Sequence, residues 1–205
     1  MRPLFQRAWV GFRESALPFV VAHNVCMKHA SMLLMVLALL PLPVHAQSAQ
    51  QILTQAESQA ASEHKNVLLV FSASWCIPCH MFETFLTDRK TGPIIAAQFV
   101  VARFDVGERK DDKKHTDTPG AVDLRASLKG NDAGYPFLVM ADAAGQPIVN
   151  SFCPSGCKPA GENIGYPATP GEIDWFMQML HQSAPSISAK DTKTIRAWLD
   201  AHGHI

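Results

Sequence analysis

The stretch Trp75-Cys76-Ile77-Pro78-Cys79 follows an apolar run at residues 67–71 and precedes a segment with helical spacing at residues 80–86. Such a run is typical of a buried central strand that helices cover. The two thiols would then lie on the first turn of a helix, where unpaired backbone N–H groups and the positive end of the macrodipole stabilise a thiolate. We therefore expect Cys76 to be the nucleophile of a redox pair and Cys79 to resolve a mixed disulfide at Cys76.

Two downstream segments extend this pattern. A second apolar run covers residues 99–106, and Tyr135-Pro136-Phe137-Leu138-Val139-Met140 begins a third. Together with residues 67–79, these segments make the region 65–182 resemble the thioredoxin superfamily. The resemblance implies that Pro136 is a cis proline facing the cysteine pair and that the backbone of Tyr135 pairs with an extended substrate segment.

The local text Trp-Cys-x-x-Cys-x-x-x-Glu most resembles the periplasmic protein-disulfide reductases, including the soluble C-terminal domain of the transmembrane thiol:disulfide interchange reductase. Glu83 matches the acid after the motif in that branch and lies four residues after Cys79, on the same helical stripe. It either accepts a proton from Cys79 during resolution or is a solvated helix residue. Trp75 either shields the thiolate and binds partners or covers the end of the sheet. The chain departs from the family at Val70, where its relatives carry a buried acid.

Periodicity predicts the remaining elements. In order, we expect a helix at 50–63, a strand at 67–72, helices at 76–87 and 93–98, a strand at 99–106, a helix between 119 and 129 that Gly130 ends, strands at 137–141 and 147–152, and helices at 171–182 and 190–202. This order predicts an α/β, thioredoxin-like fold, a four-stranded mixed sheet flanked by helices. Residues 47–64 would form an N-terminal helix, 65–183 the domain and 184–205 a C-terminal helix.

A second pair, Cys153 and Cys157, directly follows the strand that returns toward the motif. This topology places its Pro- and Gly-containing loop on the same rim as Cys76. Three interpretations stay open: a structural disulfide, a second redox-active pair that exchanges with the first, and a metal site.

The N-terminal region carries a secretory signal pattern. Met27-Lys28-His29 forms a short basic start, residues 32–40 form an apolar stretch, and Val44-His45-Ala46 supplies small residues at the minus-three and minus-one positions. We expect cleavage after Ala46 and a periplasmic or secreted protein that starts at Gln47. The apolar stretch is too short to span a bilayer, so no membrane span is expected, with an uncleaved anchor as the alternative.

Residues 1–26 hold no comparable element. We interpret them either as the result of a start site assigned too early, with Met27 as the true initiator, or as an extension of the basic region of the signal. Without Cys26, an even set of four cysteines remains, as an oxidising compartment favours. Fourteen basic and seventeen acidic residues also remain, because the first 46 residues hold four of the eighteen basic and one of the eighteen acidic residues. A mildly acidic chain without a basic stripe predicts no binding to nucleic acid or to an anionic membrane surface. The mixed charge run at 108–115 predicts a solvated loop.

Two other chemistries fit the cysteines. Cys76-Ile77-Pro78-Cys79-His80 matches the attachment pattern of a c-type haem, although that site needs neither the preceding strand nor the later Tyr-Pro segment. Four thiolates from both pairs would suit zinc or copper(I) in a metal-binding protein. We favour a thiol:disulfide oxidoreductase with no cofactor or metal, acting on protein disulfides or dithiols, with an electron donor that the sequence does not identify. Ile77-Pro78 puts no positive or polar group between the thiols, which favours a reductase.

Overall fold

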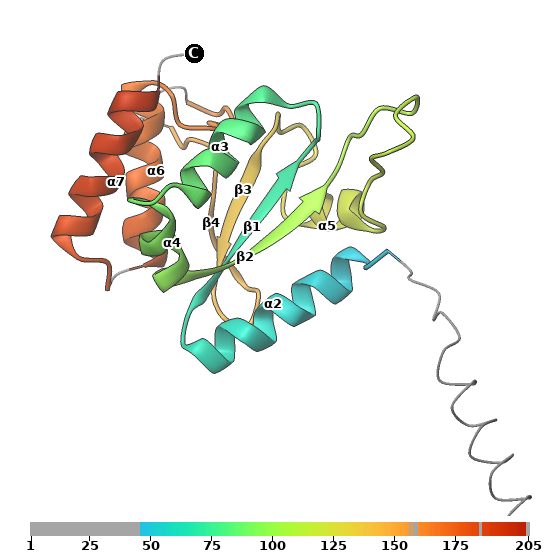
Figure 1. Ribbon diagram of the computed structural model, residues 1–205, viewed down its shortest axis with the longest axis horizontal. Coiled ribbons are helices and arrows are strands. Elements are labelled where there is room, and N and C mark those ends of the chain that lie inside the picture. The colour runs from blue at the N-terminus through green and yellow to red at the C-terminus, as the bar shows by residue number, and fades with distance from the viewer. Residues whose placement is uncertain (1–45, 156, 158–159, 185, 204–205) are drawn as a thin grey trace, which may run out of the picture. The chain divides into compact units, whose positions relative to one another are not determined.

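The computed structural model describes residues 46–155, 157, 160–184 and 186–203. Cys26 and the predicted signal before Ala46 lie outside these residues. Within the described ranges, no helix is both long and apolar enough to cross a membrane. The elements in chain order (Figure 1) are α2 (Ala49–Glu63), β1 (Asn66–Ser72), α3 (Ile77–Thr87), α4 (Gly92–Gln98), β2 (Phe99–Asp105), α5 (Ala121–Ser127), β3 (Phe137–Ala141), β4 (Pro147–Asn150), α6 (Pro170–Ser183) and α7 (Ala189–His202).

The four strands form one mixed sheet in the order β2-β1-β3-β4. β1 pairs in parallel with β2, with Val70 opposite Arg103. β3 pairs antiparallel with both β1 and β4. The two central strands carry the most continuous apolar runs because both of their faces are covered. The predicted thioredoxin-like fold is therefore confirmed.

Helices cover both faces of this sheet (Figure 1). On one face, Leu68 and Val70 of β1 pack with apolar residues of α3, α4, α6 and α7. On the other face, Val67 and Leu69 pack with α2 and α5. The alternation along β1 thus divides the core into two layers, and the first layer supports the helix that carries the cysteine motif.

The elements begin and end within two residues of the predicted bounds, and three of the differences have a structural cause. Cys76 is the N-cap of α3 rather than its first helical residue. The helix expected to continue to residue 129 ends two residues earlier, at Ser127, because Lys129 adopts a left-handed conformation with φ 64°. β4 ends at Asn150, since Phe152 beyond it pairs with Asn163 instead of continuing the ladder with β3.

An aromatic cluster holds α3 against the two C-terminal helices. The fully buried ring of Phe85 lies 5.7 Å from Phe176 of α6 and 5.4 Å from Trp198 of α7, measured between ring centroids. Such edge-to-face pairs add to the free energy of burying each ring. The position of the motif helix therefore depends on residues far along the chain.

We expect Phe85→Ala to lower the free energy of unfolding by about 3–5 kcal/mol, because it leaves a cavity among these rings. Urea denaturation followed by tryptophan fluorescence measures the loss. Val122→Ala, at an exposed position of α5, serves as the control and should change stability by less than about 0.5 kcal/mol. Equal stability of the two variants would contradict the assigned role of the cluster.

Candidate active site

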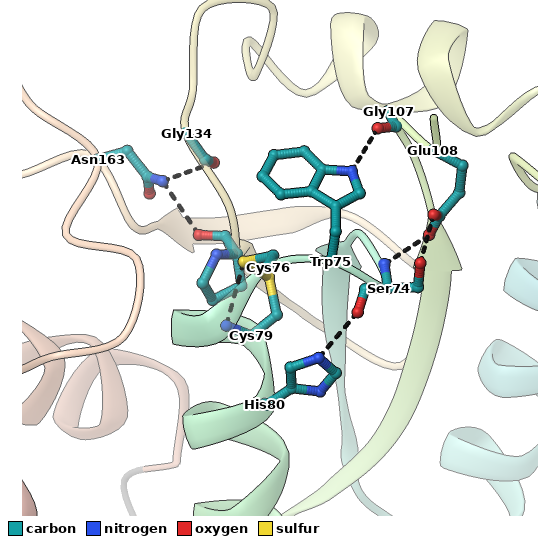
Figure 2. Close-up of a disulfide and its surroundings, with 10 residues drawn as sticks. Ser74, Trp75, Cys76, Cys79, His80, Gly107, Glu108, Gly134 and Asn163 are labelled. Atoms are coloured by element: carbon teal, nitrogen blue, oxygen red, sulfur yellow. Dashed lines mark hydrogen bonds between the residues drawn. A yellow bond between two sulfur atoms is a disulfide. The ribbon is translucent and has the colours of Figure 1, made fainter. Parts of the chain in front are cut away.

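Cys76 and Cys79 form a disulfide where α3 begins (Figure 2). The backbone N–H of Cys79 donates a hydrogen bond to the Cys76 sulfur at 3.2 Å. Pro78 occupies the first turn, where its missing N–H breaks no helical hydrogen bond. In the reduced pair, the same N–H group and the helix macrodipole stabilise a thiolate on Cys76. This geometry fits the predicted order, with Cys76 as the first nucleophile.

Both cysteines lie in a small apolar cluster, next to side chains that are exposed to solvent. Cys76 is 3% and Cys79 is 8% exposed, and the pair packs with Ala73 and Tyr135. Beside the pair, Ile77 is 67% exposed and its neighbour Trp75 is 43% exposed. A protein that reaches Cys76 therefore meets apolar side chains first.

The loop after β2 is fixed to the motif by polar contacts (Figure 2). The indole N–H of Trp75 donates to the carbonyl oxygen of Gly107 at 2.9 Å. Both the backbone N–H and the hydroxyl of Ser74 donate to the carboxylate of Glu108 at 2.6 Å. The guanidinium of Arg109 lies 5.6 Å from the centre of the Trp75 ring. The charge run at 108–115 is a loop whose residues are mostly exposed, as predicted, and its first two residues also contact Ser74 and Trp75.

The turn before β3 lies beside the cysteine pair, and its Tyr135–Pro136 peptide bond is cis, as the family resemblance implies. The Tyr135 ring packs edge-on against Trp75, with 5.9 Å between centroids. The side chain of Asn163 donates hydrogen bonds to the carbonyl oxygens of Gly134 and Pro136 (Figure 2). None of the described residues hydrogen-bonds with the backbone N–H or carbonyl of Tyr135. Within the described part of the chain, Tyr135 therefore keeps an unused backbone donor and acceptor next to the pair.

A cavity of about 180 Å³ lies next to Cys79. Its lining includes Cys79, Glu83, Arg103 and Asp105. The guanidinium of Arg103 donates two hydrogen bonds to the carboxylate of Glu83, at 2.9 and 3.0 Å, and about half of each side chain is exposed. Burial, followed by the nearby charge of Glu108, raises the pKa of Asp105 above its ordinary value. The carboxylates of Glu83 and Asp105 therefore line the same cavity as Cys79. Helical spacing after the motif predicts Glu83 at this place but not Asp105.

Cys153 and Cys157 form the second disulfide. Val139 of β3 is opposite Asn150, so the chain leaves β4 toward the end of the sheet that holds Pro136. Cys153 is buried in the core layer that contains α3 and α6, whereas Cys76 packs in a separate cluster. Among the described residues, no group of three or more His, Cys, Asp or Glu side chains is arranged to hold a metal ion.

The structure thus brings together Trp75, Cys76, Cys79, Tyr135 and Pro136, and it places Glu83 at the cavity behind Cys79. Sequence reasoning missed four polar residues around the site, namely Arg103, Asp105, Glu108 and Asn163. Of these, Arg103 and Asp105 have a signal in retrospect, because alternation along β2 places both on the face that α3 covers.

Comparisons with known proteins found similarities over part of the chain. Residues 48–143 match the family model described as Thioredoxin-like. A stretch of 99 residues is 28% identical to the thiol:disulfide interchange protein DsbD of Vibrio cholerae serotype O1, and it covers 48% of this chain. The chain spans only 15% of the length of that relative. The matched family region runs from the residue before α2 to the turn after β3 and contains the cysteine motif and the Tyr135–Pro136 turn.

Two solved structures are similar at lower identity. A disulphide isomerase from Xylella fastidiosa Temecula1 has 20% sequence identity and a TM-score of 0.44, over 79% of this chain and 97% of that one. A DsbH oxidoreductase has 18% identity and a TM-score of 0.45, over 69% of this chain and 85% of that one.

Proposed function

Because residues 48–143 of this chain form a thioredoxin-like domain, we propose that the chain is a thiol:disulfide oxidoreductase acting on cysteines of other proteins. The observation that carries the proposal is the start of α3, where the N–H of Cys79 donates to the Cys76 sulfur. Beside it, the Tyr135 backbone has no hydrogen-bond partner within the described part of the chain. The name of the partial relative, thiol:disulfide interchange protein, supports the same chemistry.

The reaction proceeds in two exchanges. The Cys76 thiolate attacks one sulfur of a substrate disulfide, forms a mixed disulfide and releases the first substrate thiolate. Cys79 then loses its proton and attacks the Cys76 sulfur, which closes the Cys76–Cys79 disulfide and releases the second substrate thiolate. Two electrons pass to the substrate, and an external dithiol must restore the reduced pair. Trp75, Tyr135 and Pro136 form the surface on which the substrate segment lies.

We expect Cys79→Ser to accumulate mixed disulfides through Cys76, because the resolving thiol is absent. Non-reducing gel electrophoresis of periplasmic extracts, followed by mass spectrometry, would detect these adducts. Cys76→Ser is the matched control and should trap nothing. The function would be rejected if Cys79→Ser formed no adduct while the protein remained folded.

The periplasm or another secreted compartment is the proposed location. The signal pattern before Gln47 supports it, and so does the second disulfide, since oxidising compartments preserve such bonds. The cell fraction in which the Cys79→Ser adducts form tests this location directly.

We propose that the reduced protein transfers electrons to its substrates and thereby reduces their disulfides. Ile77 and Pro78 supply no polar or positive side chain between the two sulfurs, so the Cys76 thiolate has only the helix terminus to stabilise it. Less stabilisation of the reduced pair makes it a better electron donor.

Equilibration with glutathione should therefore give a reduction potential below about −200 mV, nearer to thioredoxin than to the strong oxidant DsbA at about −120 mV. Alkylation and mass spectrometry quantify the reduced fraction. A measured value close to that of DsbA would reverse the direction while leaving the exchange chemistry intact.

Glu83 is the proposed proton acceptor for Cys79. It lies one helical turn beyond Cys79 at the shared cavity, and two hydrogen bonds from Arg103 fix the orientation of its carboxylate. In this arrangement Arg103 is a positioning residue. The cavity gives the proton a route to solvent, since Glu83 is partly exposed.

We expect Glu83→Gln to slow resolution of a preformed mixed disulfide by about 10²-fold near neutral pH, the usual contribution of a general base. Stopped-flow release of a chromogenic thiol measures this step. Glu57→Gln, on α2 at the opposite face of the sheet, is the control. A larger effect of Asp105→Asn than of Glu83→Gln would transfer the role to Asp105.

A further inference from the structure

One side chain holds the turn on which a substrate would lie. The amide nitrogen of Asn163 donates to the carbonyl oxygen of Gly134 at 2.9 Å and to that of Pro136 at 3.0 Å. These two carbonyl groups flank Tyr135, whose own backbone groups have no hydrogen-bond partner among the described residues. Asn163 therefore holds the residues on both sides of Tyr135 in place, and no described residue occupies the backbone groups of Tyr135 itself. The hydrogen bonds of Asn163 are drawn in Figure 2.

A buried hydroxyl sets the orientation of this amide. Ser151 is fully buried, and its oxygen accepts a hydrogen bond from the backbone N–H of Leu138 at 2.9 Å. The hydroxyl proton is then donated to the amide oxygen of Asn163 at 2.6 Å. The amide nitrogen is left to face the two carbonyl groups, whereas the flipped amide would turn an oxygen toward them.

The backbone around Asn163 is tied to the segment that follows β4. The N–H of Ile164 donates to the carbonyl of Ser151 at 2.9 Å, and Asn163 itself pairs with Phe152. Cys153 both donates to the carbonyl of Glu162 and accepts from the N–H of Gly161. One end of the Cys153–Cys157 disulfide is thus the residue whose backbone hydrogen bonds hold Gly161 and Glu162, directly before Asn163.

We propose that Asn163 is a positioning residue for an extended polypeptide substrate, and that the Cys153–Cys157 disulfide acts through it. This inference rests on the proposed function. By holding the Gly134 and Pro136 carbonyls, Asn163 orients the N–H and carbonyl of Tyr135 for a short backbone ladder with the substrate segment. It contacts neither sulfur of the redox pair, so its effect falls on binding and not on the intrinsic reactivity of Cys76.

The test compares a peptide that contains one disulfide with the small aromatic disulfide dithionitrobenzoate, each mixed with the pre-reduced protein after removal of all other thiols, so that the protein is the electron donor. Asn163→Ala should raise the apparent KM for the peptide roughly 10-fold, the loss expected for one to two hydrogen bonds, with little change in the limiting rate. Its rate with dithionitrobenzoate should equal that of the wild type, because this compound has no backbone to pair with Tyr135. Asn131→Ala, at an exposed position of the turn after α5, is the control and should leave both substrates unaffected.

Each result has a distinct meaning. An unchanged KM for the peptide, or an equal loss with both substrates, would overturn the positioning role of Asn163. Failure of the wild type to reduce either substrate would instead overturn the proposed function. If Asn163→Ala does not fold, Asn163→Asp replaces it, since this variant keeps the acceptor for Ser151 and turns an acceptor, in place of the donors, toward the two carbonyl groups of the turn.

The second disulfide is tested in the same assay. A Cys153→Ser/Cys157→Ser variant should raise KM for the peptide in the wild-type background and add little in the Asn163→Ala background, because the two changes remove one shared effect. If KM for the peptide did not rise in the wild-type background, or rose by the same factor again in the Asn163→Ala background, the disulfide would not act through Asn163.

Discussion

The start of α3 is the constraint on which the rest of the site depends. A helix leaves its first N–H groups without intrahelical partners, and here one of them, from Cys79, is directed at the Cys76 sulfur. That donor has a fixed position only because β1 delivers the chain to the motif and because buried rings such as Phe85 hold the helix on the sheet. Aromatic packing in the core thus determines where a negative charge on sulfur is stabilised.

The sheet supplies the second half of the site. Because β3 runs antiparallel to β1, the residue before it lies at the end of the sheet where β1 leads into the motif. The return of the chain along β4 brings Asn163 to the same place from the following loop. The cysteine pair and the Tyr135–Pro136 turn therefore belong to different segments that the strand order brings together.

Sequence patterns predicted the elements well, because apolar runs and helical spacing report which faces are buried. The helix predicted from residue 171 begins one residue earlier, at Pro170, where the side chain of Thr169 accepts from the N–H of Glu172. Such patterns did not predict the polar contacts around the site. The hydrogen bonds from Ser74 to Glu108 and from Asn163 to Pro136 join residues 34 and 27 positions apart, and no local periodicity encodes either pairing. Such contacts follow from loop paths, which depend on the finished fold.

The cavity behind Cys79 shows how the position of an ion pair depends on its neighbours. Val70 of β1 lies opposite Arg103 of β2 in the parallel register. A valine offers no acceptor to that guanidinium, which instead donates to Glu83 from the helix above the sheet. The Glu83 carboxylate thus occupies a half-exposed position on the helix and lines the same cavity as Cys79. At such a position water and the guanidinium of Arg103 both contact the carboxylate, so that it avoids the desolvation cost of a buried acid.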